Sequence, residues 1–225
     1  MALILNLETA TKVCSVSLSK NGKEIITKSI KSEKYSHSEN LNLFIEAIFN
    51  ETDFLISQID AVAVSKGPGS YTGLRIGVST AKGLCYALDK PLIAINSLTA
   101  LASLSQIKSD FIIPLFDARR MEVYSTVYQQ NLTQIEAVKA VIIDKDSYSK
   151  YLQKGDTLFL GPGAEKCQKV LTHKNAKFDL KTEVSSIGMM GLAEDKYNQQ
   201  QFEDVAYFEP FYLKEFIAGQ PKKMF

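Results

Sequence analysis

The chain has 225 residues, of which 45% are apolar and 23% are charged, the mix of an ordinary globular protein. Its 26 basic side chains nearly balance 25 acidic ones, so a net charge of +1 excludes strong attraction of the isolated chain to nucleic acid. No apolar stretch reaches the roughly 20 residues of a membrane-spanning helix, and the N-terminus does not resemble a secretory signal. Three cysteines without metal-site or redox-pair spacing fit reduced thiols, so we expect a cytoplasmic protein that does not bind membranes.

The first thirty residues predict a β-meander. Residues 3–7, 14–19 and 24–30 read as three strands, and Asn21-Gly22 is a hairpin turn between the last two.

From Ser36 the period changes to that of a helix. Leu41, Phe44, Ile45 and Ile48 follow the i, i+3, i+4, i+7 spacing of an apolar helical stripe. Further along we expect a strand over 61–64, a helix over 72–88, a strand over 92–95 and a helix over 97–106. This order of elements predicts a ribonuclease-H-like lobe, in which helices pack on a mixed sheet.

After Asp110 a similar pattern begins again. We expect strands over 111–116, 122–128, 136–143 and 157–160, and helices from Asp144 to Leu152, over 165–171 and over 186–198. A second lobe of related topology follows, with an N-terminal lobe over residues 1–105 and a C-terminal lobe over 106–225. The tail at 220–223 is expected to be frayed.

The sharpest local motif is GPGSYTGLR at residues 67–75, a glycine-rich turn that opens onto a helix. Such a turn binds phosphate when backbone N–H groups and the helix dipole face an anion. The motif is neither a Walker loop nor a GxGxxG fingerprint. A purely structural strand-to-helix turn is the alternative, and both stay open.

Gly73, Gly77 and Ala81 recur every four residues and leave one helix face almost without side chains. A partner backbone could approach there, or the face could pack on the lobe's own sheet. The other faces carry apolar side chains most of the way round, which favours burial on more than one side.

Residues for hydrolytic or metal chemistry are few. His37 and His173 are the only histidines and belong to no ligand motif; capping or an ordinary surface role is expected for His37. Glu8 could act as one acid of a two-metal site, but the strand over 61–64 ends without a second one.

Three motifs together resemble the TsaB family, the small non-catalytic paralogues of the threonylcarbamoyl transferase TsaD. They are LETAT at 7–11, KGPGSYTGLRIG at 66–77, and DAR at 117–119 followed by EVY at 122–124. The likeness is close in the N-terminal half and loose in the C-terminal half. Glu8 stands where the family usually has aspartate.

The resemblance implies an α/β, actin-like ATPase (ASKHA) fold of two ribonuclease-H-like lobes. It implies a role without catalysis, because the catalytic paralogue has two metal-binding histidines in a VNHLEGH pattern where this chain reads INSLTAL. Ser97 and Leu101 occupy those positions. No catalytic residue and no metal ligand is therefore predicted.

The implied function is that of a partner subunit in the complex that forms N6-threonylcarbamoyladenosine next to the tRNA anticodon. The expected partners are a TsaD-like transferase, a small TsaE-like ATPase, and tRNA only within the complex; alone, the chain is expected to form a homodimer. No cofactor is expected, apart from ATP or ADP at the interface with the partner.

Two sets of site residues follow. Candidates for nucleotide or phosphate contact are Glu8, Thr9, Gly67, Gly69, Ser70 and Thr72. Candidates for the partner interface are Leu41, Phe44, Ile45, Ile48, Gly73, Ile76, Gly77 and Ala81.

An enzyme of the same superfamily is the alternative. A small phosphotransferase or ATPase could use Glu8 as base or metal anchor and the loop at 67–73 for phosphate. Gly161-Pro162-Gly163 would be its second phosphate loop. A metalloprotease is disfavoured, because only two histidines are present.

Overall fold

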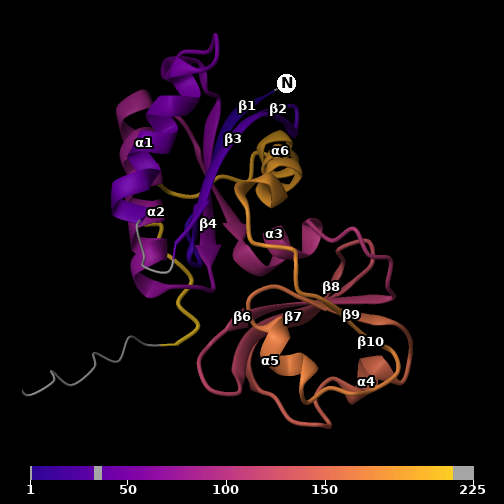
Figure 1. Cartoon of the computed structure of the whole chain (residues 1–225). Helices are drawn as coiled ribbons and strands as arrows, with labels where there is room; N and C mark the ends of the chain where they lie inside the picture. Colours follow the sequence, from indigo (N-terminus) through magenta and orange to yellow (C-terminus); the bar gives the residue numbers. More distant parts are fainter. Residues whose placement is uncertain (1, 33–36, 215–225) are drawn as a thin grey trace, which may run out of the picture.

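The structure, a computed structural model, describes residues 2–32 and 37–214 and contains two lobes, each with a five-stranded mixed sheet (Figure 1). The first sheet has the order β3-β2-β1-β4-β5. β1 pairs antiparallel with β2 and parallel with β4; β2–β3 is antiparallel and β4–β5 parallel. The strands are β1 (Leu3–Glu8), β2 (Val13–Lys20), β3 (Lys23–Lys31), β4 (Ala61–Gly67) and β5 (Leu92–Asn96).

The second sheet repeats this topology. Its order is β10-β9-β6-β7-β8; β6–β7 and β7–β8 are antiparallel, whereas β6–β9 and β9–β10 are parallel. The duplication confirms the predicted α/β fold of two ribonuclease-H-like lobes. Its strands are β6 (Phe111–Asp117), β7 (Glu122–Gln129), β8 (Gln134–Ile142), β9 (Thr157–Leu160) and β10 (Ala176–Asp179).

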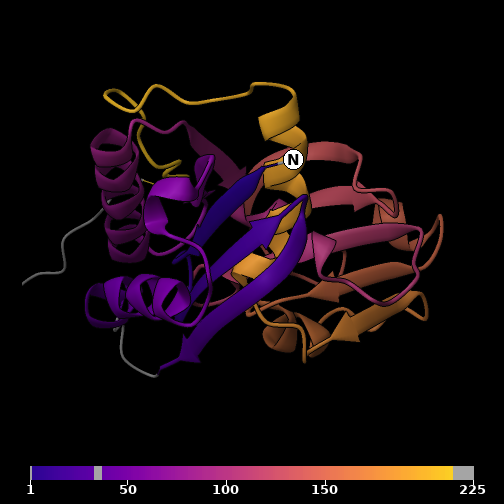
Figure 2. The same ribbon diagram turned by 90° about the horizontal axis from the view of Figure 1, so that it is seen from above.

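Helices cover both faces of the first sheet (Figure 2). α1 (His37–Asn50) and α2 (Tyr71–Leu88) pack on one face around a core that includes Leu5, Val62 and Val64. The opposite face packs against α3 and α6 through Ile4 and Ile93. The remaining elements are η1 (Ile56–Gln58), α3 (Ser97–Ser103), α4 (Ser149–Leu152), α5 (Ala164–Gln168), η2 (Ser186–Met189) and α6 (Met190–Asn198).

The N-terminal elements lie where the sequence predicts them. Asn21 and Gly22 both have positive φ, 56° and 68°, as a tight hairpin turn requires. The predicted start of the first helix at Ser36 lies outside the described residues, as does the tail at 220–223. Within the described part of the chain, no helix is both long enough and apolar enough to cross a bilayer.

Two predictions in the C-terminal half were wrong in detail, and one strand was missed. Asp144 does not begin a helix: its Oδ1 accepts hydrogen bonds from the Asp146 amide and the Ser147 hydroxyl, and helix α4 begins only at Ser149. The predicted helix over 186–198 divides into the 3₁₀ turn η2 and the helix α6. Strand β10 was not predicted.

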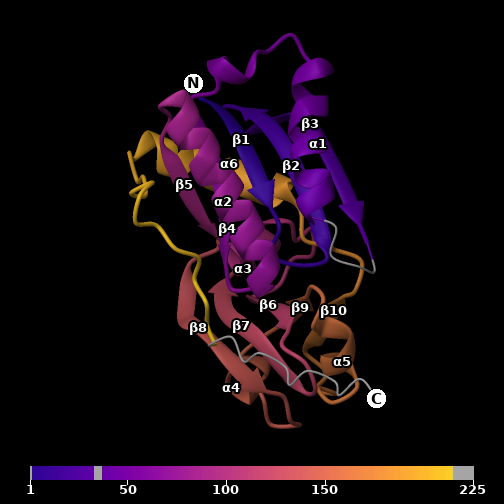
Figure 3. The same ribbon diagram turned by 90° about the vertical axis from the view of Figure 1, so that its left-hand side faces the viewer.

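The chain returns to the first lobe after completing the second sheet. We expected residues 106–225 to form the C-terminal lobe; within this range, α6 packs on β1 and β5 (Figure 1). The segment of residues 203–214, called the strap below, then runs beside β5 and α2 toward the second lobe (Figure 3). Helix α6 and the strap therefore complete the N-terminal lobe.

Candidate functional site

The glycine-rich motif forms the connection between β4 and α2. Gly67 has φ +107°, a conformation that L side chains rarely adopt, and an added Cβ would lie 2.5 Å from the carbonyl oxygen of Phe211 in the strap. Ser70 is the N-cap of α2, because its Oγ accepts the Gly73 N–H at 3.2 Å. The turn is thus held from both sides.

Two backbone donors of this turn are bound within the chain. Gly67 N–H donates to Ser97 Oγ at 3.1 Å, and Ser70 N–H donates to the Ala10 carbonyl at 2.7 Å. A Cβ on Gly69 would lie 2.5 Å from the same carbonyl oxygen, so the β1–β2 turn fills the space beside the loop. This arrangement is a strand-to-helix turn, and phosphate contact by Gly67, Gly69, Ser70 and Thr72 stays a prediction.

Glu8 is a buried acid at the end of β1. Its Oε1 accepts the Ala10 N–H at 2.6 Å, whereas Oε2 has no hydrogen-bond partner among the described residues. Burial raises the pKa of Glu8 to about 7, against the opposing effect of the Ala10 N–H. Thr9 is also fully buried, with its amide donating to Ser65 Oγ at 3.2 Å. Glu8 and Thr9 therefore do not reach the surface.

His37 joins α1 to the β1–β2 turn. Its Nε2 lies 2.8 Å from the Thr11 carbonyl oxygen, so the ring donates there and Nε2 carries the proton. Burial lowers its pKa, partly opposed by this hydrogen bond. Of the two roles expected for His37, the surface role was wrong, because the residue is only 1% exposed, and the capping role stays a prediction.

The two positions that carry histidines in the catalytic paralogue are part of the interior. Ser97 is buried and accepts the Gly67 N–H, and Leu101 is buried against Gly161, where an added Cβ would collide with Leu101. Among residues 2–32 and 37–214, no group of three or more His, Cys, Asp or Glu side chains could hold a metal ion. His173, the other histidine, is exposed.

The space between the lobes is filled by an apolar cluster. At this cluster, Thr99 Oγ1 of the first lobe and the Tyr128 hydroxyl of the second form a hydrogen bond of 2.5 Å. The predicted second phosphate loop borders this region at Gly161, which faces Leu101, and its Gly163 N–H donates to the Leu115 carbonyl at 2.8 Å. The cluster consists of Ala10, Leu74, Leu98, Leu101, Ala102, Ile112, Phe116, Tyr128, Leu160 and Val184.

Most of the predicted interface residues are buried in the first lobe. A Cβ on Gly73 would collide with the Thr9 carbonyl oxygen, and one on Gly77 with Thr9 Oγ1, so this helix face packs on the β1–β2 turn. This is the intramolecular alternative that the sequence left open. Buried in the same way are Leu41, Ile45, Ile48 and Ala81. Phe44 and Ile76 are only partly buried.

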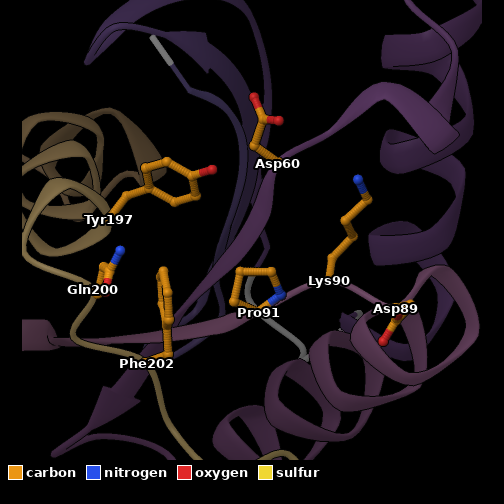
Figure 4. A pocket seen from close by; sticks show the side chains of 7 residues that line it. All are labelled: Asp60, Asp89, Lys90, Pro91, Tyr197, Gln200 and Phe202. Carbon is orange, nitrogen blue, oxygen red and sulfur yellow. The ribbon is translucent and has the colours of Figure 1, made fainter.

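Two hollows are open on the described surface. One, of about 330 Å³, is lined by Asp60, Asp89, Lys90, Pro91, Tyr197, Gln200 and Phe202 (Figure 4). Asp60 in this hollow is engaged at Oδ2 by the Leu3 N–H at 2.7 Å. The other, of about 380 Å³, lies between α2 and the strap. Neither hollow could be predicted from the sequence, because both depend on the return of the C-terminal segment, which periodicity does not reveal.

Comparison with known proteins places these features in a family. The sequence model of the TsaD family, described as tRNA N6-adenosine threonylcarbamoyltransferase, matches residues 24–219. A "tRNA threonylcarbamoyladenosine biosynthesis protein TsaB" of Haemophilus influenzae is 27% identical over 226 residues, covering 96% of this chain and 94% of that protein.

The protein of the same name in Bacillus subtilis is 36% identical over 135 residues, which is 60% of this chain and 58% of that relative. A solved structure from Pseudomonas aeruginosa, an uncharacterized protein with similarity to peptidase YEAZ, has a TM-score of 0.84. It is 23% identical, and the match covers 95% of this chain and all of that one. This structural likeness concerns the fold.

Proposed function

Because the chain belongs to the TsaD family and, within it, to the TsaB branch, we propose that it is a non-catalytic partner subunit in the formation of N6-threonylcarbamoyladenosine in tRNA. It binds a TsaD-like transferase and supports its activity. A small TsaE-like ATPase joins the pair, and tRNA is bound only by the complex.

The observation that carries this proposal is the state of the two histidine positions. Ser97 forms a buried hydrogen bond to Gly67, and Leu101 packs against Gly161 and the apolar cluster between the lobes. A metal-binding imidazole at either position would need a rebuilt interior. Such a chain contributes by binding the transferase, not by catalysing the reaction itself.

A partner surface is supported by the outer faces of α1 and α2. Within His37–Asn50, α1 carries Glu39 and Glu46 and no basic residue; α2 carries Arg75 and Lys82 and no acidic one. Exposed apolar side chains accompany these charges, with Leu43 59% and Tyr86 87% exposed. A partner with the same kind of helix pair would match both charge and apolar contact when related by a two-fold axis.

This surface also favours a homodimer when the transferase is absent. ATP or ADP would bind where the partner completes a site, since the amides of Gly67, Ser70 and Gly73 donate within the chain. The pairing of these three amides leaves fewer donors for a phosphate in the phosphotransferase alternative.

Co-purification with the transferase of the same organism tests the proposal. The chain should bind the transferase with a one-to-one ratio of subunits, and modified adenosine should form only when transferase, ATPase partner, threonylcarbamoyl adenylate and tRNA are all present. The isolated chain should form none. Turnover by the isolated chain, or failure of the wild-type chain to bind the transferase, would contradict the proposal.

A further inference from the structure

The strap is fastened to the first lobe at several points along its length. Glu203 N–H donates to the Leu92 carbonyl at 2.9 Å, and Phe211 N–H donates to the Lys66 carbonyl at 2.7 Å. Between them, Lys82 Nζ of α2 donates to the carbonyls of Ala206 and Phe208, both at 3.0 Å. These bonds make the strap a fixed wall beside α2.

A groove of about 380 Å³ lies between this wall and the helix. The rings of Tyr71 and Tyr212 meet across one end of the groove, with centroids 4.7 Å apart and planes at 37°. The Arg75 guanidinium lies over the Tyr71 ring, 5.5 Å from its centroid. The groove residues used below are Tyr71, Arg75, Ser79, Lys82, Glu209 and Tyr212.

Arg75 contacts the Tyr71 ring, but its charge is not paired with a carboxylate of the described residues. Its guanidinium forms no ion pair with Glu209, or with any other carboxylate of residues 2–32 and 37–214. Lys82, in contrast, is held by the two strap carbonyls. A guanidinium held against a ring is restricted in its motion, and its paired N–H donors suit the two oxygens of a carboxylate.

The charge around Arg75 favours an anion. Helix α2 contains no acidic residue from Tyr71 to Leu88, and Arg75 lies in its second turn, near the positive end of the helix dipole. Ser79 is exposed beside it, so the groove is continuous with the outer face of α2.

We propose that the groove between α2 and the strap receives an acidic side chain of the transferase partner, whose carboxylate pairs with Arg75. This inference rests on the partner role proposed above and names the chemistry of one contact within it. A protein carboxylate is favoured over RNA, because one unpaired cation matches a single carboxylate, whereas an RNA backbone brings several phosphates and Glu209 at the rim repels each of them.

Charge reversal at Arg75 tests the inference. Binding of the transferase is measured by calorimetry for the wild-type chain, Arg75→Glu, Arg75→Lys and the control Lys145→Glu, which makes the same charge change at an exposed lysine of the other lobe. Arg75→Glu should weaken binding at least about tenfold, and Arg75→Lys by less, since lysine keeps the charge and loses the paired geometry. The control should match the wild-type chain. Melting temperatures and circular dichroism establish that all four are folded.

Each of the other outcomes contradicts either the groove contact, the partner role or the carboxylate assignment. If the wild-type chain binds the transferase and Arg75→Glu binds it with the same affinity, the groove contact is rejected and the partner role stands. No binding by the wild-type chain rejects both. If Arg75→Glu retains the transferase and lowers only tRNA affinity of the complex, the occupant is a phosphate and the carboxylate assignment is wrong.

Discussion

The amide of Gly67 and the hydroxyl of Ser97 form a buried hydrogen bond of 3.1 Å that joins the glycine-rich turn to the first turn of α3. The position that could have held a metal ligand thus stabilises the loop that could have held a phosphate. The glycine-rich turn and the Ser97 position, which each suggest catalysis, therefore bind each other. This structural contact explains the presence of both without a phosphate or a metal ion.

Removing this hydroxyl should destabilise the fold. Ser97→Ala leaves the buried Gly67 N–H without an acceptor, which typically costs about 1–3 kcal/mol of unfolding free energy. Urea denaturation measures the loss. Ser79→Ala, at an exposed serine of α2, should stay within about 0.5 kcal/mol of the wild-type value. Equal stability of Ser97→Ala and the wild-type chain would show that the bond contributes nothing.

The buried acid Glu8 should make stability depend on pH. Its folded pKa of about 7 is raised above the unfolded value of 4.5, so the folded state holds the proton more tightly. The resulting stabilisation is complete below pH 4.5 and is lost as pH rises through 7. From pH 5 to pH 8 the loss should be about 2–3 kcal/mol.

Glu8→Gln isolates this effect, since the amide oxygen can still accept the Ala10 N–H and cannot ionise. The difference in unfolding free energy between wild type and variant should change across this pH range. A constant difference would mean that Glu8 does not titrate there.

Two glycines of α2 should respond oppositely to alanine. At Gly77 a Cβ would collide with Thr9 Oγ1, so Gly77→Ala should destabilise the lobe by about 1–3 kcal/mol. At Gly83 a Cβ meets no atom within 4 Å, so Gly83→Ala should stabilise it by about 0.4–1 kcal/mol. Thermal unfolding of both variants measures these changes. If Gly77→Ala instead weakened only partner binding, this helix face would lie at an interface.

The exposed Leu43 on α1 allows a test of the partner surface. Leu43→Asp places a charge on the outer helix face and should weaken homodimer and transferase binding about tenfold or more, while unfolding is unchanged. Ile142→Asp is the matched control, at a 72% exposed apolar residue on β8 of the other lobe. Analytical ultracentrifugation and calorimetry give the affinities. Equal effects of the two substitutions would place the contact away from α1.

The sequence was most informative where burial and spacing agree. β1 to β5 and the two long helices follow from short apolar runs, the helical stripe and the Asn21-Gly22 turn, because β1, β2, β4 and β5 lie almost wholly in the core and α1 and α2 each bury one face. β10 escaped prediction because its alternation of apolar and charged residues is only four residues long and its side chains are only half-buried. Asp144 was misleading because aspartate caps turns and helices through the same short hydrogen bonds.

The site was less predictable than the fold. Spacing identified Gly73 and Gly77 as a close-approach face, and only the structure shows that the approaching group is Thr9 of the same chain. The strap contacts to Lys66 and Lys82 join residues more than 120 positions apart, and no local pattern records them.

The return of the C-terminal segment also sets the order in which the protein can be completed on the ribosome. Ile4, Ile93 and Ile95 of the first sheet are covered by Met189 and Ala193, which are made roughly a hundred residues after Ile93 and Ile95 and nearly two hundred after Ile4. Until they emerge, one side of the earlier sheet faces water with its apolar residues bare. The N-terminal lobe is thus synthesised first and completed last. The C-terminal lobe can fold before Met189 and Ala193 cover the first sheet.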